Sequence, residues 1–103
     1  MARGIEFEAL GKRWSLRMSI TAICSVEAEL RMTFDQALKA VQTGSILTLR
    51  TMLGAGLGGK LPAEKVSDII EDIGLERAGE LIGEAIALAF PQPDAESEPD
   101  LGN

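Results

Sequence analysis

A glycine-rich segment near the middle of the chain carries the patterns closest to a phosphate-binding site. Its glycines match the dinucleotide-binding pattern G-x-G-x-x-G at Gly54, Gly56 and Gly59, and the segment matches the start of a P-loop as far as Lys60. The dinucleotide-binding pattern requires a strand before the glycines, whereas a helical pattern precedes them here. The P-loop requires Ser or Thr after the lysine to hold Mg²⁺, and Leu61 stands there. We therefore interpret the segment as a helix C-terminus that unwinds through glycines into a mobile loop.

Four acidic residues at helical spacing are the candidate metal ligands. They are Glu64, Asp68, Glu71 and Asp72, and they do not have the spacing of an EF-hand loop. The chain contains no histidine, so any site would be built from oxygen atoms alone. The sequence therefore predicts a solvated helix face, with no bound metal and no cofactor.

The candidate nucleophile is Cys24, the only cysteine, which also excludes an internal disulfide. A cysteine nucleophile requires an activating base, and no histidine is present to supply one. Its neighbours Ile23 and Val26 are apolar, so we expect Cys24 to be a small buried residue. The spacing brings no Ser, Lys or Glu residues together as a catalytic pair. The sequence therefore predicts a protein that is not an enzyme and has no small-molecule substrate.

Charge is unevenly distributed along the chain. Residues 1–59 carry seven basic and five acidic residues, for a net charge of +2. Residues 60–103 carry three basic and eleven acidic residues, for a net charge of −8. The acidic half repels nucleic acid and anionic membranes, so we expect neither to be a partner.

The sequence also predicts a cytoplasmic protein. Glu6 and Glu8 interrupt the position where the apolar run of a signal peptide would begin. The most apolar stretch, residues 81–90, contains Gly83 and Glu84. It is also far shorter than the ~20 residues that span a bilayer.

Residues 5–18 show the alternation typical of a β-hairpin around a Gly11-Lys12 turn. The alternation places Phe7, Trp14 and Leu16 on one face. On the other face, two glutamates are free to pair across the strands with two arginines; these residues are Glu6, Glu8, Arg13 and Arg17. Because an isolated hairpin is only marginally stable, we expect helices to cover its apolar face.

Five short amphipathic helices are predicted after the hairpin. Ser19 and Ser45 are candidate N-caps, and Thr33 with Gln36 forms a capping box. Pro62 suits a first helical turn, and glycines at 44 and 74 are candidate C-caps. The predicted buried stripes are Ile20, Ile23, Val26 and Leu30; Phe34, Leu38 and Val41; Ile46, Leu49, Met52 and Leu53; Val66, Ile69, Ile70 and Ile73; and Leu75, Ala78, Leu81, Ile82, Ala85, Ile86 and Ala89.

These elements predict one α+β domain over residues 1–90, mostly helical, with an N-terminal hairpin packed on the helices. Residues 91–103 hold three prolines, four acids and one large apolar side chain, Leu101. Such a segment buries too little apolar surface to offset its ordering entropy. We expect it to be a disordered acidic tail.

The chain resembles the small phage-like proteins of gene transfer agents, which are grouped with tail assembly chaperones and also labelled as tail tube proteins. The resemblance covers roughly residues 5–90, and the acidic tail departs from it. The features that carry it are a hairpin with Phe7, Gly11, Trp14 and Leu16; a helix of the form Ser19-Ile20-Thr21-Ala22-Ile23 leading to Val26-Glu27; an aliphatic helix entering Leu53-Gly54-Ala55-Gly56-Leu57; and an alanine-rich helix that ends near Phe90.

The resemblance implies a role in tail morphogenesis, either as a chaperone that coats the long helical tape-measure protein or as a structural tail subunit. A tube subunit needs a broad β-sheet to form a ring, and this sequence offers one hairpin, which favours the chaperone. The partners implied are the tape-measure protein and, secondly, the chain itself, with association to the virion as a further expectation.

A third hypothesis is a small helical regulator that binds DNA. A recognition helix requires polar or basic side chains on its exposed face. The helix that starts at Thr33 offers Gln36, Lys39 and Gln42, whereas the other helices offer little and the net charge is unfavourable. This hypothesis therefore ranks below the two tail roles.

Four apolar residues are the candidate contacts for a protein partner: Met18, Met32, Leu57 and Leu61. A groove between helices suits an amphipathic helix, and methionine adapts its shape to varied partners. The alternative for Met18 and Met32 is that they fill gaps in the core.

Overall fold

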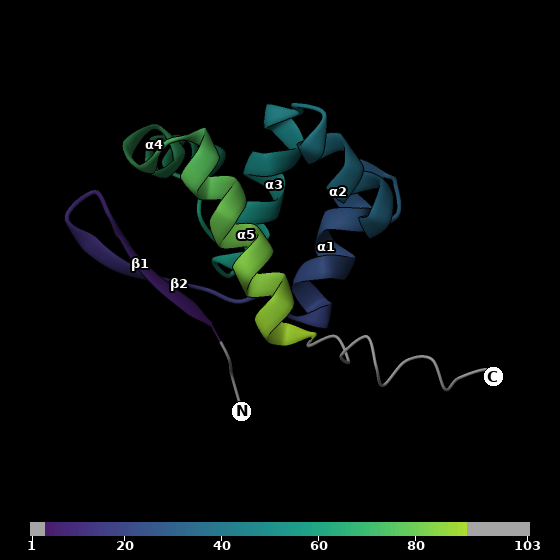
Figure 1. The fold of residues 1–103 in the computed structure, drawn as a ribbon, viewed down its shortest axis with the longest axis horizontal. Coiled ribbons are helices and arrows are strands. Elements are labelled where there is room, and N and C mark those ends of the chain that lie inside the picture. Colours follow the sequence, from purple (N-terminus) through teal and green to yellow (C-terminus); the bar gives the residue numbers. More distant parts are fainter. Residues whose placement is uncertain (1–3, 91–103) are drawn as a thin grey trace, which may run out of the picture.

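The computed structural model describes residues 4–90, which form a two-stranded antiparallel sheet followed by five helices (Figure 1). This arrangement confirms the predicted fold class, α+β and mostly helical. The predicted tail, residues 91–103, lies outside the described residues. The elements are β1 (Ile5–Ala9), β2 (Lys12–Leu16), α1 (Ile20–Leu30), α2 (Phe34–Gln42), α3 (Ile46–Gly56), α4 (Ala63–Ile73) and α5 (Leu75–Ala89).

The hairpin has the two faces that its alternation predicts. Phe7 pairs with Trp14 and Ile5 with Leu16, so these side chains share the face that packs on α4 and α5. On the other face the Arg13 guanidinium lies 3.2 Å from a carboxylate oxygen of Glu6 and 3.8 Å from one of Glu8. The second predicted arginine, Arg17, is not part of this cluster within the described residues. Strand pairing stops one residue earlier, and the Arg17 N–H donates instead to the Gly56 carbonyl at 2.9 Å.

The hairpin turn lies one residue earlier than predicted, at Leu10-Gly11. Ala9 pairs with Lys12, so Lys12 belongs to β2. Both central residues have positive φ, 54° at Leu10 and 74° at Gly11, the combination of a type I′ turn, whose twist matches that of the flanking strands. The Leu10 N–H donates to an Asp72 carboxylate oxygen at 2.9 Å, which ties the turn to α4.

Replacing Leu10 with asparagine is expected to raise the free energy of unfolding by about 1 kcal/mol, because asparagine adopts the left-handed conformation at lower cost than leucine. The Asp72 contact uses the backbone N–H and remains available in the variant. Urea denaturation of Leu10→Asn against Leu10→Ala is the measurement, since both variants remove the leucine side chain. Equal stability of the two would contradict this account of the turn.

The local signals at the helix ends are largely confirmed. Ser19, Thr33 and Ser45 accept hydrogen bonds from the backbone N–H three residues on, and Gln36 completes the capping box at Thr33. Pro62 lies one position earlier than predicted. It is the N-cap of α4, with an extended backbone, and Ala63 begins the helix. Short polar side chains and glycines thus set most of the helix boundaries.

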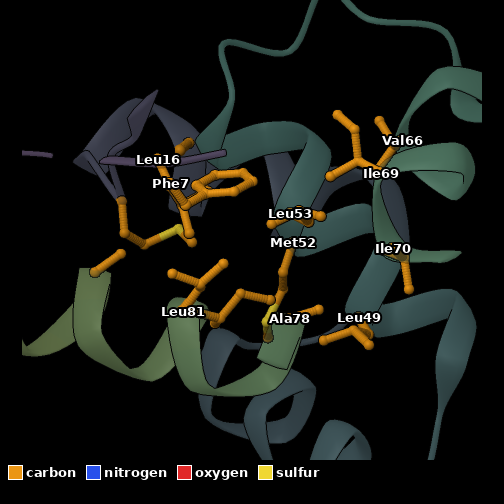
Figure 2. Close-up of a cluster of buried hydrophobic side chains, with 14 of the residues drawn as sticks. Phe7, Leu16, Leu49, Met52, Leu53, Val66, Ile69, Ile70, Ala78 and Leu81 are labelled. Carbon is orange, nitrogen blue, oxygen red and sulfur yellow. The ribbon is translucent and has the colours of Figure 1, made fainter. Parts of the chain in front are cut away.

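Helix α3 lies at the centre of the helical cluster and contacts each of the other four helices. Figure 2 shows Phe7 and Leu16 from the hairpin, Met52 and Leu53 from α3 and Leu81 from α5 within one apolar cluster. Burial of these side chains is the main driving force for packing the hairpin on the helices. The fully buried large side chains are Leu16, Met18, Val26, Met52, Leu53, Ile69 and Leu81.

Three residues predicted to lie in buried stripes are exposed instead. Ile20, Ile46 and Leu75 are 63%, 57% and 50% exposed. Each is the first residue of its helix. Side chains in a helix point toward its N-terminus, so a first-position side chain extends past the helix end rather than onto the neighbouring helix.

Candidate protein-docking surface

The four candidate partner contacts do not form one exposed surface. Met18 is fully buried, so its prediction as a contact is wrong: it follows β2 directly and fills the core beside Gly56. Met32, Leu57 and Leu61 are partly buried and pack against the edge of the core. Leu57 and Leu61 line two different depressions, and Met32 lines neither.

The expectation that Cys24 is buried is also wrong, because its side chain is exposed. Ala22 and Val26 are the buried residues of α1, and they are four positions apart on one face. Cys24 lies midway between them in sequence and therefore on the opposite side of the helix. The apolar neighbours that suggested burial occupy other faces.

The glycine segment is the end of α3, as the sequence predicts. The N–H groups of Leu57, Gly58 and Gly59 donate to carbonyls of the last helical turn at 3.0 to 3.2 Å. A phosphate-binding loop needs such N–H groups to be free for the ligand. Here they close the helix terminus, where Gly58 and Gly59 have positive φ.

The acidic set on α4 forms a solvated face. All four of its residues are exposed, and Asp72 accepts the hydrogen bond from the hairpin turn. Among residues 4–90, no three His, Cys, Asp or Glu side chains come together as a group that would hold a metal ion.

An apolar groove lies between the N-terminal ends of α3 and α5. It consists of two adjoining depressions of about 530 Å³ and about 290 Å³, both of which are lined by Ile46 and Leu75. Leu47 also lines the larger depression and is 57% exposed. Three large exposed apolar side chains therefore lie together, and we call this surface the α3–α5 groove.

The core and two helix ends position the groove. Leu49 and Ile70 line it and also belong to the buried cluster (Figure 2). Ser45 caps α3 by accepting from the Thr48 N–H at 3.2 Å and so places Ile46 at the start of the helix. Gly74 is both the C-cap of α4 and the residue before α5, which brings Leu75 to the groove.

Two acidic side chains line the groove, one in each depression. Glu71 lies in the larger one and Glu76 in the smaller one. Neither forms a salt bridge or a side-chain hydrogen bond within residues 4–90, whereas Glu80 and Glu84 both lie beside Arg77. The one basic side chain in the groove, Arg50, donates to the Ser67 hydroxyl at 3.3 Å. The groove therefore combines exposed apolar side chains with two carboxylates that are free to pair with a partner.

Helical periodicity did not predict this surface, because it places Ile46 and Leu75 in the core stripes of their helices. The available signal was position along the chain: Ile46 directly follows the predicted N-cap Ser45, and Leu75 directly follows the predicted C-cap Gly74. A side chain at the first position of a helix extends past the helix end.

These observations define a small α+β domain, mostly helical, with an apolar groove on its surface. No family model, curated protein or solved structure significantly matches this chain. None of the helices within residues 4–90 has the length and apolar character needed to cross a membrane.

Proposed function

We propose that this chain is a tail assembly chaperone of a phage-like particle, and that it binds the tape-measure protein through the α3–α5 groove. The observation that carries the proposal is the clustering of Ile46, Leu47 and Leu75, each at least half exposed, over one groove. Contiguous exposed apolar surface marks sites of protein interaction. The resemblance to tail assembly chaperones of gene transfer agents supplies the partner.

The shape of the surface favours a protein partner over a small molecule. Pockets for small ligands enclose most of the ligand surface. Here the lining side chains project into solvent, which suits the apolar stripe of a helix laid across them. A long helical partner offers many such stripes, so weak contacts with many copies of this chain combine into stable coating.

The sheet supports the chaperone over the structural subunit. Within residues 4–90 the only sheet has two strands, and α4 and α5 pack on one of its faces. A ring-forming tube subunit needs a broader sheet. No comparable feature favours DNA binding, since the groove is lined by two acids and one arginine that is already hydrogen-bonded.

Co-expression with the tape-measure protein tests the proposal. We expect the chain to co-purify with that protein and to raise its soluble fraction. The double variant Leu47→Ser with Leu75→Ser is expected to bind at least ~10-fold more weakly, because each buried leucine contributes about 1.5–3 kcal/mol. The matched control is Ile20→Ser with Phe90→Ser, which removes two exposed apolar side chains elsewhere.

Circular dichroism should show the same helical content for both double variants, because all four side chains are exposed. Failure of the unaltered chain to bind the tape-measure protein would overturn the proposal, as would equal losses in the two variants. Rings or tubes of the isolated chain in electron micrographs would instead support the structural subunit. Salt-sensitive retardation of DNA would support the regulator.

A further inference from the structure

We infer that the α3–α5 groove selects an amphipathic helix whose apolar stripe is flanked by lysine or arginine. This inference rests on the proposed function and specifies the chemistry of the partner. Its basis is that each of the two depressions is lined both by exposed apolar side chains and by one acidic side chain. Glu71 accompanies the exposed side chains in the larger depression, and Glu76 accompanies those in the smaller one.

Both carboxylates are available to a partner. Within the described part of the chain, neither lies within salt-bridge distance of a basic group, although four other acids of the hairpin and α5 are bridged by Arg13 and Arg77. An apolar partner without basic residues would partly desolvate Glu71 and Glu76 and leave them unpaired, which is unfavourable. A lysine or arginine beside the apolar stripe removes that penalty.

The same charges argue against two other occupants. The groove is lined by two acids and one arginine, a net charge of −1, so a second copy docked groove to groove about a two-fold axis would bring together two surfaces of like net charge. The segment 91–103 carries four acids and no basic residue, so it is repelled as well. Charge complementarity therefore selects a basic helix from a different protein.

The arrangement of the groove suits a helix in particular. Its two depressions adjoin through the shared side chains of Ile46 and Leu75. An amphipathic helix presents apolar anchors at successive turns along one face, so neighbouring anchors occupy adjoining depressions. Basic residues on either side of that face then reach the carboxylates at the rim.

Two fluorescein-labelled model peptides test the inference against the full chain by fluorescence anisotropy. Both carry the same leucine stripe on a helical frame, and their remaining positions are lysine and glutamine in one and glutamate and glutamine in the other. We expect the lysine peptide to bind about 10-fold more tightly at low ionic strength, and the difference to shrink as salt screens the charges.

Matched charge variants locate the effect. Glu71→Gln with Glu76→Gln is expected to weaken binding of the lysine peptide about fivefold. Glu64→Gln with Asp68→Asn removes two exposed α4 acids that do not line the groove and changes the net charge equally. We expect this control to weaken binding less than twofold, because screened charges act mainly at short range.

Three results of the peptide-binding experiments would overturn the inference. They are equal affinities for the two peptides, equal losses in the two charge variants, and binding of the lysine peptide that survives Leu47→Ser with Leu75→Ser. A chain that self-associates through the groove in sedimentation experiments would also overturn it, since a second copy would then be the occupant. These results can be told apart from the test of the proposed function. If Leu47→Ser with Leu75→Ser abolishes binding of the tape-measure protein and Glu71→Gln with Glu76→Gln does not weaken it, the chaperone role stands and the charge selectivity is wrong.

Discussion

Replacing Leu16 with alanine is expected to lower the free energy of unfolding by about 3 kcal/mol, the usual cost of truncating a buried leucine. Leu16 ends β2 and is fully buried, in the cluster with Phe7 and Leu81. The truncation removes contacts between the hairpin and the helices and leaves a cavity. Urea denaturation followed by far-ultraviolet circular dichroism is the measurement.

The matched control for this prediction is Leu47→Ala, the same substitution at a side chain that is 57% exposed. Its effect should stay within about 0.5 kcal/mol, as for most surface substitutions. Similar losses in the two variants would show that the hairpin adds little to the stability of the helical cluster.

Replacing Gly56 with valine is expected to destabilise the fold by about 2–3 kcal/mol, through overpacking. A Cβ atom at this position would lie 2.5 Å from Cδ1 of Leu16 and 3.4 Å from Cε of Met18. Both of those side chains are fully buried, so moving either of them away from the added side chain disturbs the core around it. The substitution would also disturb the backbone hydrogen bond from Arg17 to Gly56, which joins the end of the hairpin to α3.

Two controls separate overpacking from other effects of the valine. Gly83→Val places the same side chain on an exposed helical position where a Cβ meets no atom within 4 Å, so its effect should stay within about 0.5 kcal/mol. In a Leu16→Ala background, the cost of Gly56→Val should fall, since the clashing atoms are gone. A cost that stays unchanged in that background would assign the effect to the helix backbone.

The parts of the fold that sequence predicts well are those governed by local chemistry. The capping box at Thr33 and Gln36 and the caps at Ser19 and Ser45 satisfy N–H groups three residues away, so the chain itself contains both partners. The period of two in the hairpin is local in the same sense. The position of the turn was harder to predict from the sequence, because Leu10 adopts a positive φ that its residue type disfavours. Its contact with Asp72 comes from a helix far along the chain.

The surface was the harder part to predict. Whether Met18 is a docking residue or core depends on how closely the hairpin approaches α3, and Gly56 sets that approach. Periodicity identifies the buried side of a helix but not where along its length the neighbouring helices end. Ile46 and Leu75 fit their stripes, yet both lie past the packed region. The groove arises because two such helix ends meet, which depends on tertiary structure.

The shape of the α3–α5 groove depends on the backbone torsion angles of the single residue that joins α4 to α5. Gly74 alone separates the two helices, with φ 95° and ψ 151°, a combination open essentially only to glycine. No neighbouring atom would obstruct a side chain there, so backbone torsion is the sole constraint on the residue type. The angle between the helices, and with it the separation of Glu71 from Glu76, is therefore encoded in one achiral residue. Substitutions on either side of Gly74 therefore change the side chains at the groove without changing the torsion angles that fix the joint.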